Sequence, residues 1–197
     1  MFLSSKSEKT EFLGSPTSKE DERLWANFLN GNELAFCAIY NKYVNALFNY
    51  GMHLYPDREA NKELIQELFS FLWQNRSSLK EVHQVNGYLF ICYRNLVFRR
   101  IKEKDNWGPL DLIPNGNELA EVSTEEVWIG METRKANADR IKNAIEGLPP
   151  RQREVVILKF FNGLNNDQLA DILGISKEGI YNLMSKAIGK LRLLVKN

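Results

Sequence analysis

The chain has 197 residues, of which 44% are hydrophobic and 26% are charged, and this balance is typical of a soluble globular protein with one or two domains. No apolar run approaches the roughly 20 residues needed to cross a bilayer, and the N-terminus lacks the apolar core of a signal peptide, so we expect no stable membrane insertion. The two cysteines, Cys37 and Cys92, are too few for a disulfide framework and favour a protein of the reducing cytoplasm.

The net charge of +1 hides an uneven distribution of charged residues along the chain. Residues 1–93 carry 9 basic and 11 acidic side chains, whereas residues 94–104 carry 5 basic and 1 acidic. Residues 105–133 then carry 7 acidic side chains and no basic ones, and residues 134–197 carry 12 basic and 6 acidic. Two basic segments on either side of an acidic connector are compatible with binding to a nucleic-acid backbone, although the net charge alone argues against it.

The first half of the chain is predicted to be helical after a short tail. Residues 1–19 are rich in Ser, Lys and Thr without a clear period, which predicts a disordered tail. Apolar residues then recur at intervals of three and four, as in amphipathic helices, and the breaks at Asn30-Gly31-Asn32 and Pro56-Asp57 combine turn and N-cap residues. We therefore predict a helical domain over residues 20–104, with helices at about 19–29, 33–54, 58–75 and 85–104.

The second half begins with a connector. Residues 105–135 contain prolines, glycines and the acidic run, which predicts a flexible linker before a second helical domain over residues 136–197. Pro149-Pro150 ends one helix and starts the next, because proline is tolerated only in the first turn of a helix. The segment Val155–Phe161 is apolar nearly all round, which is typical of a short buried helix. Since no segment shows strand alternation, we expect an all-α fold of two small helical domains joined by a flexible acidic linker.

The segment from Asn166 to Lys186 has the pattern of a helix-turn-helix. Two helices that cross at a steep angle need a small residue at their contact, which Ala170 provides. They also need a turn residue that tolerates a left-handed conformation, which Gly174 provides. The apolar residues spaced to share one inner face are Leu169, Leu173, Ile175, Ile180 and Leu183. The pattern predicts a module that binds duplex DNA, and the alternative is a helical hairpin without a ligand.

The second helix of this motif is expected to present the side chains that contact DNA. Ser176 is suited to cap the helix by accepting a backbone N–H. Gly179, inside the helix, is a departure that costs about 1 kcal/mol relative to alanine. The early outward positions, which would meet base edges and phosphates in the major groove, are Lys177, Glu178, Tyr181, Asn182 and Ser185.

Two earlier helical segments combine charged or polar side chains with aromatic or apolar ones. Residues 88–104 alternate aromatic and basic side chains, which suits single-stranded or melted DNA because aromatic rings stack on bases and arginines contact phosphates. The alternative is that Phe90, Phe98 and one tyrosine belong to a core and the arginines are merely solvated. Residues 63–76 interleave acidic and amide groups with large apolar ones, and alone this pattern favours a plain amphipathic core helix.

The sequence predicts no catalytic site and no metal or other cofactor. His53 and His83 are isolated, without a partner at metal-ligand spacing, and no glycine-rich phosphate loop is present. A helical hydrolase that used Cys92 or His83 would need a general base and an orienting group, and the sequence suggests neither. We therefore expect a protein that is not an enzyme.

In this order, the segments resemble those of bacterial RNA polymerase sigma factors, most closely the small extracytoplasmic-function class that keeps only regions two and four. The residues that carry the resemblance are 24–43, 63–76, 88–104 and 148–192. The opening Leu-Pro-Pro-Arg-Gln-Arg-Glu, followed by the turn motif, is its most specific part. The resemblance implies a subunit that directs core RNA polymerase to promoter DNA and assists promoter opening. It also implies an anti-sigma factor that covers both domains.

The resemblance also implies roles for individual residues. Region two would bind the largest polymerase subunit through Leu64, Gln66, Glu67, Phe69 and Trp73. The same domain would bind the minus-ten element through Asn86, Tyr88, Arg94, Asn95, Arg99 and Arg100. Region four would read the minus-thirty-five element through Ser176, Lys177, Glu178, Tyr181, Asn182, Ser185 and Lys186. Its apolar surface would contact the polymerase flap.

Two departures from the family pattern bear on which promoter is recognised. Asn165-Asn166 stands where family members often have Ser or Thr followed by an aromatic residue, and Glu178-Gly179 is unusual in the reading helix. The rival interpretation is a dimeric response-regulator-like transcription factor that binds palindromic operators. Its N-terminal half would be an α/β domain, and the lack of strand patterns in residues 20–104 argues against it.

Overall fold

The computed structural model describes residues 19–105 and 140–196, so the predicted tail and most of the predicted linker lie outside the described residues. Every regular element in these two ranges is a helix, which confirms the all-α class. The N-terminal unit (19–105) contains α1 (Lys19–Leu29), α2 (Glu33–Leu54), α3 (Arg58–Asn75) and α4 (Val85–Asp105). The C-terminal unit (140–196) contains a helix at 140–146, α6 (Pro150–Val156), the π-helix η1 (Ile157–Phe161), α7 (Asn166–Leu173) and α8 (Lys177–Lys196).

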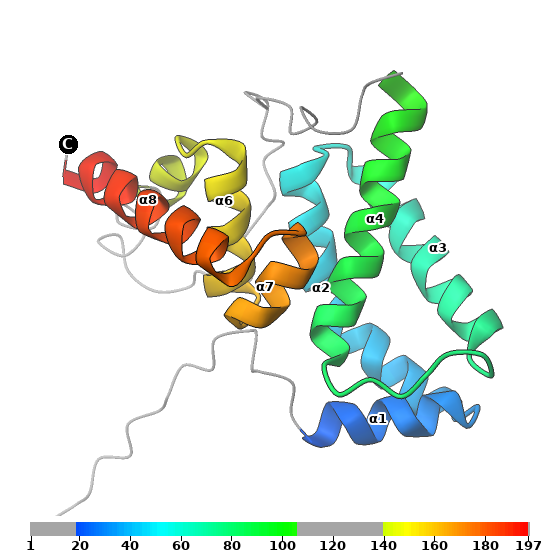
Figure 1. Cartoon of the computed structure of the whole chain (residues 1–197). Coiled ribbons are helices and arrows are strands. Elements are labelled where there is room, and N and C mark those ends of the chain that lie inside the picture. The colour runs from blue at the N-terminus through cyan, green and yellow to red at the C-terminus, as the bar shows by residue number, and fades with distance from the viewer. Residues whose placement is uncertain (1–18, 106–139, 197) are drawn as a thin grey trace, which may run out of the picture.

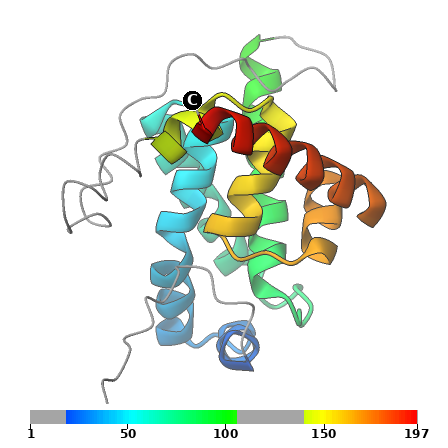
Figure 2. The ribbon, with the colours of Figure 1, turned by 90° about the vertical axis from the view of Figure 1, so that its left-hand side faces the viewer.

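The two units pack against one another. Figure 1 shows α2, α3 and α4 as neighbours, with α1 lying across their lower end. The C-terminal unit contacts this bundle through α7, which lies against α4. Figure 2, turned by 90°, shows α8 packed across α6.

Side-chain caps define the starts of α2, α3 and α7. Asn32 and Asp57 each accept the backbone N–H three residues later at 3.0 Å, and so begin α2 and α3. Asn165 and Gln168 form a reciprocal capping box at the start of α7, with hydrogen bonds of 2.9 and 2.8 Å. These bonds satisfy N–H groups that have no partner within the helix. The asparagine at position 165 therefore serves the fold as well as a serine or threonine would.

A buried polar contact lies where the end of α2 and the start of α3 meet α4. The buried Asn61 amide donates to the Tyr55 carbonyl at 2.7 Å, and the Tyr93 hydroxyl donates to Asn61 Oδ1 at 2.7 Å. Gly51 leaves room for this pair, because a Cβ there would lie 1.9 Å from Asn61 Oδ1 and 2.3 Å from the Tyr93 hydroxyl oxygen. The close approach of the three helices therefore depends on this glycine.

We expect Gly51→Ala to lower the free energy of unfolding by about 3 kcal/mol, because the added methyl displaces two buried hydrogen-bonding groups. Urea unfolding followed by circular dichroism measures this loss. Gly189→Ala on α8 is the matched control, since nothing lies within 4 Å of a Cβ added there. The control should be neutral or stabilising, because alanine favours helix over glycine. Equal losses in the two variants would contradict this account of Gly51.

A histidine near the end of α2 makes stability dependent on pH. Burial and, to a smaller extent, the positive charges of Arg153 and Lys142 lower the pKa of His53 from 6.5 to about 4. Between these two values the unfolded chain binds a proton that the folded chain does not, so stability falls as the pH drops below 6.5. We expect His53 to lower the free energy of unfolding by about 2 kcal/mol between pH 7 and pH 5. Urea unfolding at the two pH values should show a smaller change in the free energy of unfolding for His53→Gln than for the wild type. An unchanged difference would contradict the prediction.

The apolar segment Val155–Phe161, which we predicted to be a short buried helix, is buried only in its first half. Val155 and Leu158 are 0% exposed, whereas Phe160 and Phe161 are 53% and 51% exposed. The helix changes from α to π at Ile157, and the wider turn shifts the register so that the two phenylalanines face outward. That part of the prediction was wrong, and the two rings form an apolar surface on the C-terminal unit.

Candidate nucleic-acid interface

The helix-turn-helix predicted from the sequence is formed by α7, a tight turn and α8. Gly174 closes α7 with a left-handed φ of 64°, a conformation that residues with a Cβ disfavour. Ser176 then caps α8 by accepting the Gly179 N–H at 3.2 Å. Leu169 and Ile180, one from each helix, are both 0% exposed. The small turn and the apolar contact hold α8 at a fixed angle on α7.

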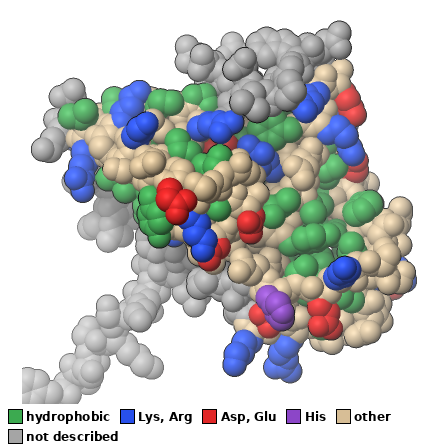
Figure 3. Space-filling model, in the orientation of Figure 1, with side chains coloured by type: hydrophobic (Ala, Val, Ile, Leu, Met, Phe, Trp, Pro, Cys, Tyr) green, Lys and Arg blue, Asp and Glu red, His purple; other side chains and the backbone are tan. Residues whose placement is uncertain are grey.

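The side chains predicted to read duplex DNA are all exposed, and they lie on the first half of α8 or on its cap. Tyr181 is 61% exposed, which is unusual for a large aromatic residue without a bound partner. Figure 3 shows lysine and arginine side chains along the α8 side of the molecule. The exposed set is Ser176, Lys177, Glu178, Tyr181, Asn182, Ser185 and Lys186.

Three members of this set, Ser176, Lys177 and Glu178, are engaged with neighbouring polar groups. Lys177 Nζ lies 2.6 Å from Asp167 Oδ1 of α7, and the hydrogen bond and charge of Asp167 raise the pKa of Lys177. Glu178 receives its own backbone N–H and the Ser176 hydroxyl, and both lower its pKa. Its carboxylate therefore takes part in capping α8, where a negative charge also complements the helix dipole. The sequence patterns did not indicate this role.

The side chains predicted to bind melted DNA separate into two groups along α4. Asn95 and Arg99 are exposed, and Arg100 is half-buried. Arg99 pairs with Glu67, and Arg100 Nη1 lies 3.1 Å from Glu63 Oε2, with both carboxylates on α3. This side of α4 is therefore accessible, and α3 partly neutralises its charge. The Arg99–Glu67 ion pair also joins a residue that we predicted to bind DNA to one that we predicted to bind polymerase.

The second group is less accessible, and two of its members, Asn86 and Arg94, face the C-terminal unit. Asn86 is 3% exposed and donates to the carbonyl of Asn162 at 3.2 Å. Arg94 Nε donates to Glu154 Oε1 at 2.9 Å. Burial acts to lower the pKa of Arg94, but Glu154 and Tyr50 together outweigh burial and raise it. Tyr88 is half-buried against α1, and burial raises its pKa to about 12.

The aromatic residues of α4 are largely core residues. Phe90 and Tyr93 are 1% and 0% exposed, as the alternative interpretation of this helix expected. Phe98 is half-buried, and the Arg94 guanidinium lies over its ring at 4.4 Å from the centroid. The same alternative expected the arginines to be merely solvated, but they form ion pairs with carboxylates. Tyr88 and Phe98 are the aromatic residues of this pattern that reach the surface in part.

The residues predicted to bind polymerase also divide between core and surface. Leu64 is 1% exposed and supports α3 from inside the bundle, so its side chain does not reach a partner directly. Gln66 and Glu67 are exposed, and Trp73 is half-buried. A shallow groove of about 540 Å³ lies between α2 and α3. Its lining is Phe36, Tyr40, Lys62, Gln66, Phe69, Ser70, Trp73 and Gln74.

The groove adds aromatic residues that the sequence patterns did not single out. Phe36 and Tyr40 come from α2 and pack edge-on against Phe69 of α3, with ring centroids 6.0 and 4.8 Å apart. Their spacing of four residues on one helix is the signal that indicates a shared face. Phe71, which follows Ser70 of the groove lining in α3, is 53% exposed. An apolar, aromatic and partly open surface of this kind is typical of a protein interface.

The described ranges contain no helix that is long and apolar enough to cross a membrane. They also contain no group of three or more His, Cys, Asp or Glu side chains that could hold a metal ion. Cys37 is exposed and Cys92 is half-buried, and neither forms a disulfide.

Comparisons with known proteins show that the chain is similar to sigma factors. The family model described as Sigma-70, region 4, matches residues 138–191. RNA polymerase sigma factor SigZ of Bacillus subtilis (strain 168) is 24% identical over 159 residues, which cover 80% of this chain and 85% of SigZ. Among solved structures, CnrH in complex with the cytosolic domain of CnrY has a TM-score of 0.62 at 18% identity, over 90% of this chain and 98% of CnrH.

A second solved structure has the same fold. The sigma factor RpoE of Bartonella quintana, crystallised with the anti-sigma factor NepR, has a TM-score of 0.54 at 19% identity. The match covers 82% of this chain and 96% of RpoE. At these identities the two structures show similarity of fold, and the similarity extends across both helical units.

Proposed function

We propose that the two helical units of this chain bind two separate elements of one promoter. The chain belongs to the RNA polymerase sigma factors, of the extracytoplasmic-function class that its sequence resembles. A sigma factor directs core RNA polymerase to specific promoters and assists promoter opening. The observation that carries the proposal is the exposed face of α8, where seven polar or aromatic side chains follow a rigid turn. This is the arrangement in which a recognition helix enters the major groove.

The C-terminal unit is proposed to read the minus-thirty-five element as duplex DNA. Tyr181 and Asn182 lie near the start of α8, where side chains reach base edges, and asparagine is suited to bidentate contact with adenine. Lys186, a turn further along, is suited to a phosphate contact. The boundaries of this region are proposed to be 136–197, after a connector at 105–135.

The N-terminal unit, with proposed boundaries at 20–104, would bind both the minus-ten element and the polymerase. The exposed Arg99 and Asn95 of α4 would contact the melted strand. The aromatic groove between α2 and α3, with Gln66 at its rim, would bind the largest polymerase subunit. Two weak DNA contacts on one chain act together, because binding of the first raises the local concentration of the second.

The chain itself is proposed to catalyse no reaction and to need no cofactor. Polymerase supplies the chemistry of RNA synthesis, and the sigma factor supplies location and strand opening. The place of action is then the cytoplasm, where polymerase and chromosome are. We also propose control by an anti-sigma factor, supported by the similarity of fold to RpoE, which was solved in complex with one.

Reconstitution with core polymerase tests the proposal. The full chain, mixed with core polymerase, should co-elute with it in gel filtration and should enable initiation on genomic DNA fragments that core polymerase alone ignores. A chain that binds DNA alone as a dimer, and neither co-elutes with polymerase nor enables initiation, would contradict the proposal and favour the operator-binding transcription factor.

The ion pair between α7 and α8 leads to a prediction about affinity. Asp167→Asn should raise affinity for a minus-thirty-five duplex by about threefold at low salt, because Lys177 becomes free to contact phosphate. Asp171→Asn, at an exposed carboxylate of the same helix, removes the same charge and is the control. Fluorescence anisotropy over a salt series measures both variants. An equal increase in the two would contradict a specific role for the Lys177–Asp167 pair.

A further inference from the structure

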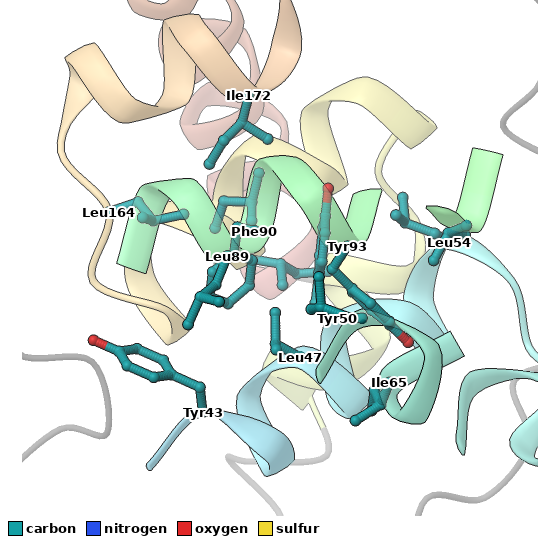
Figure 4. Packing of buried hydrophobic residues seen from close by; sticks show 14 of the residues in the cluster. Tyr43, Leu47, Tyr50, Leu54, Ile65, Leu89, Phe90, Tyr93, Leu164 and Ile172 are labelled. Carbon is teal, nitrogen blue, oxygen red and sulfur yellow. The ribbon is translucent and has the colours of Figure 1, made fainter. Parts of the chain in front are cut away.

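The start of α8 is held in a fixed orientation by the hydrophobic core. Figure 4 shows Ile172 of α7 pointing toward Phe90, and both side chains are 4% exposed or less. Ile180, near the start of α8, is 0% exposed and belongs to the same hydrophobic cluster. The outer face of α8 therefore presents a defined set of side chains.

Four exposed side chains form one stripe on that outer face. Recognition helices in the major groove contact bases through positions spaced as i, i+3, i+4 and i+7, which share one side of a helix. The exposed residues of α8 with this spacing are Glu178, Tyr181, Asn182 and Ser185. By the helical period, Lys177 and Lys186 flank the stripe on opposite sides, where they are suited to the phosphates that border the groove.

The first member of the stripe is already bonded within the protein. The Glu178 carboxylate accepts its own backbone N–H and the Ser176 hydroxyl, and these bonds lower its pKa. Ser176 in turn accepts the Gly179 N–H at 3.2 Å, so Ser176 and Glu178 together cap α8. A base contact from Glu178 would require its own bonds to break.

The other three members have no such bonds to lose. In the part of the chain that the structure describes, the side chains of Tyr181, Asn182 and Ser185 make no hydrogen bond. The Tyr181 side chain is also 61% exposed, although its ring is apolar. The contacts that these three side chains can make are therefore available to DNA.

The chemistry of these side chains selects between base pairs. An asparagine amide donates and accepts at the same time, so it matches N7 and the N6 amino group of adenine in the major groove. The ring of Tyr181, one residue earlier, offers an apolar edge to the 5-methyl group that distinguishes thymine. The Ser185 hydroxyl bonds to several bases and selects little. Arginine is the side chain that most often reads guanine, and α8 has none before Arg192.

We propose that α8 reads adjacent A·T pairs within the minus-thirty-five element, with adenine bound by Asn182 and a neighbouring thymine methyl group contacted by Tyr181. Glu178 caps the helix and contacts no base. The inference rests on the proposed function, because it requires α8 to enter the major groove of that element. Promoters without adenine opposite Asn182 are expected to be transcribed about tenfold less.

The experiment uses the strongest promoter recovered from genomic DNA with the reconstituted polymerase. Its region near minus thirty-five is made random, and each template carries a tag in the transcribed part. Core polymerase with the full chain transcribes this library, and sequencing of the RNA tags gives the activity of every template. The unchanged chain should prefer adenine about tenfold at one position, beside a preferred A·T pair.

An arginine variant tests the contact of Asn182 with adenine. Asn182→Arg should change the preference at that one position from adenine to guanine, because arginine bonds to both major-groove acceptors of guanine. Lys190→Arg adds an arginine to α8 outside the stripe and is the matched control. Its base preference should equal that of the unchanged chain.

A glutamine variant tests whether Glu178 reads a base. If Glu178 bound cytosine, Glu178→Gln would change the preference at that position to adenine, because glutamine binds adenine through both groups of its amide. We expect the same base preference for Glu178→Gln and for the unchanged chain. A change from cytosine to adenine would overturn the role assigned to Glu178.

A modified template tests the contact of Tyr181 with the thymine methyl group. Uracil lacks this methyl group but pairs with adenine in the same way as thymine. Uracil in place of the thymine beside the Asn182 position should lower single-round transcription about fourfold for the unchanged chain. It should have no effect for Tyr181→Ala. Equal effects of uracil on the two proteins would overturn the thymine contact.

The result of the library decides between failure of this inference and failure of the proposed function. An element made of G·C pairs, or an adenine preference that Asn182→Arg leaves unchanged, would overturn the assignment of adenine to Asn182. The proposed function would stand in both cases, because a preferred element near minus thirty-five would still be present. A library without any preference in that region would contradict the proposed function as well.

Discussion

Replacing Tyr181 and Asn182 with alanine is expected to reduce transcription from a promoter with its minus-thirty-five element by about 100-fold, because each side chain is placed to contribute about 1–3 kcal/mol of base contact. Both side chains are exposed at the start of α8, which the Gly174 turn and the buried Ile180 hold on α7. Removing them leaves the helix intact, because neither contributes to its packing. Single-round transcription with reconstituted polymerase measures the change.

A scrambled minus-thirty-five element makes this prediction specific. The unchanged chain should lose about as much activity on the scrambled template as the double variant loses on the intact one. The double variant should be indifferent to scrambling. Lys190→Ala, further along α8, is the control on the same helix and should respond to scrambling like the unchanged chain. A double variant that still distinguishes the two templates would show that α8 does not read this element.

Replacing Arg99 and Arg100 with alanine is expected to slow open-complex formation by about 100-fold, since two charge-assisted contacts to phosphate are lost. In the free chain these arginines pair with Glu67 and Glu63 of α3. Their removal leaves two carboxylates beside the melted strand, which adds repulsion to the loss of contact. Permanganate reactivity of unpaired thymines around the start site measures opening directly.

A template with a preformed bubble separates opening from other defects. If the two arginines act in opening, transcription of the arginine variant should recover on premelted DNA. Lys102→Ala, an exposed lysine of the same helix, is the control and should open duplex DNA normally. A defect that persists on premelted DNA would assign the arginines to polymerase binding or to folding instead.

The helices and the turn motif could be predicted because their signals are local. The caps at Asn32, Asp57 and Asn165 lie within three residues of the N–H groups that they bind, and the left-handed Gly174 is set by the turn itself. The exposed face of α8 follows from helical period alone. These features depend on neighbours in the sequence, and sequence patterns record such neighbours directly.

The packing partners of α3 and α4 could not be predicted in the same way. Tyr50 and Glu154 are 104 residues apart in the sequence, and no period connects them. Phe90 and Arg94 are four residues apart and share one face of α4, but nothing in their spacing indicates that the C-terminal unit covers this face. The outward turn of Phe160 depends on a single π-helical insertion, which residue composition does not indicate. Each of these features is decided by tertiary contacts.

The rival interpretation, an operator-binding transcription factor with an α/β N-terminal half, conflicts with the fold. Residues 19–105 form four helices and no strand. The similarity to SigZ also extends over 80% of the chain, beyond the helix-turn-helix that the two classes share. The similarity to sigma factors therefore extends over both units.

The most direct test of the central claim is to sequence the 5′ ends of RNA made on genomic DNA by core polymerase with and without the full chain. We predict new start sites that appear only with the chain and that share one sequence element near minus ten and another near minus thirty-five. The second element should lose its enrichment when the chain carries Tyr181→Ala and Asn182→Ala. Start sites that are the same with and without the chain would contradict the claim that it directs polymerase to promoters.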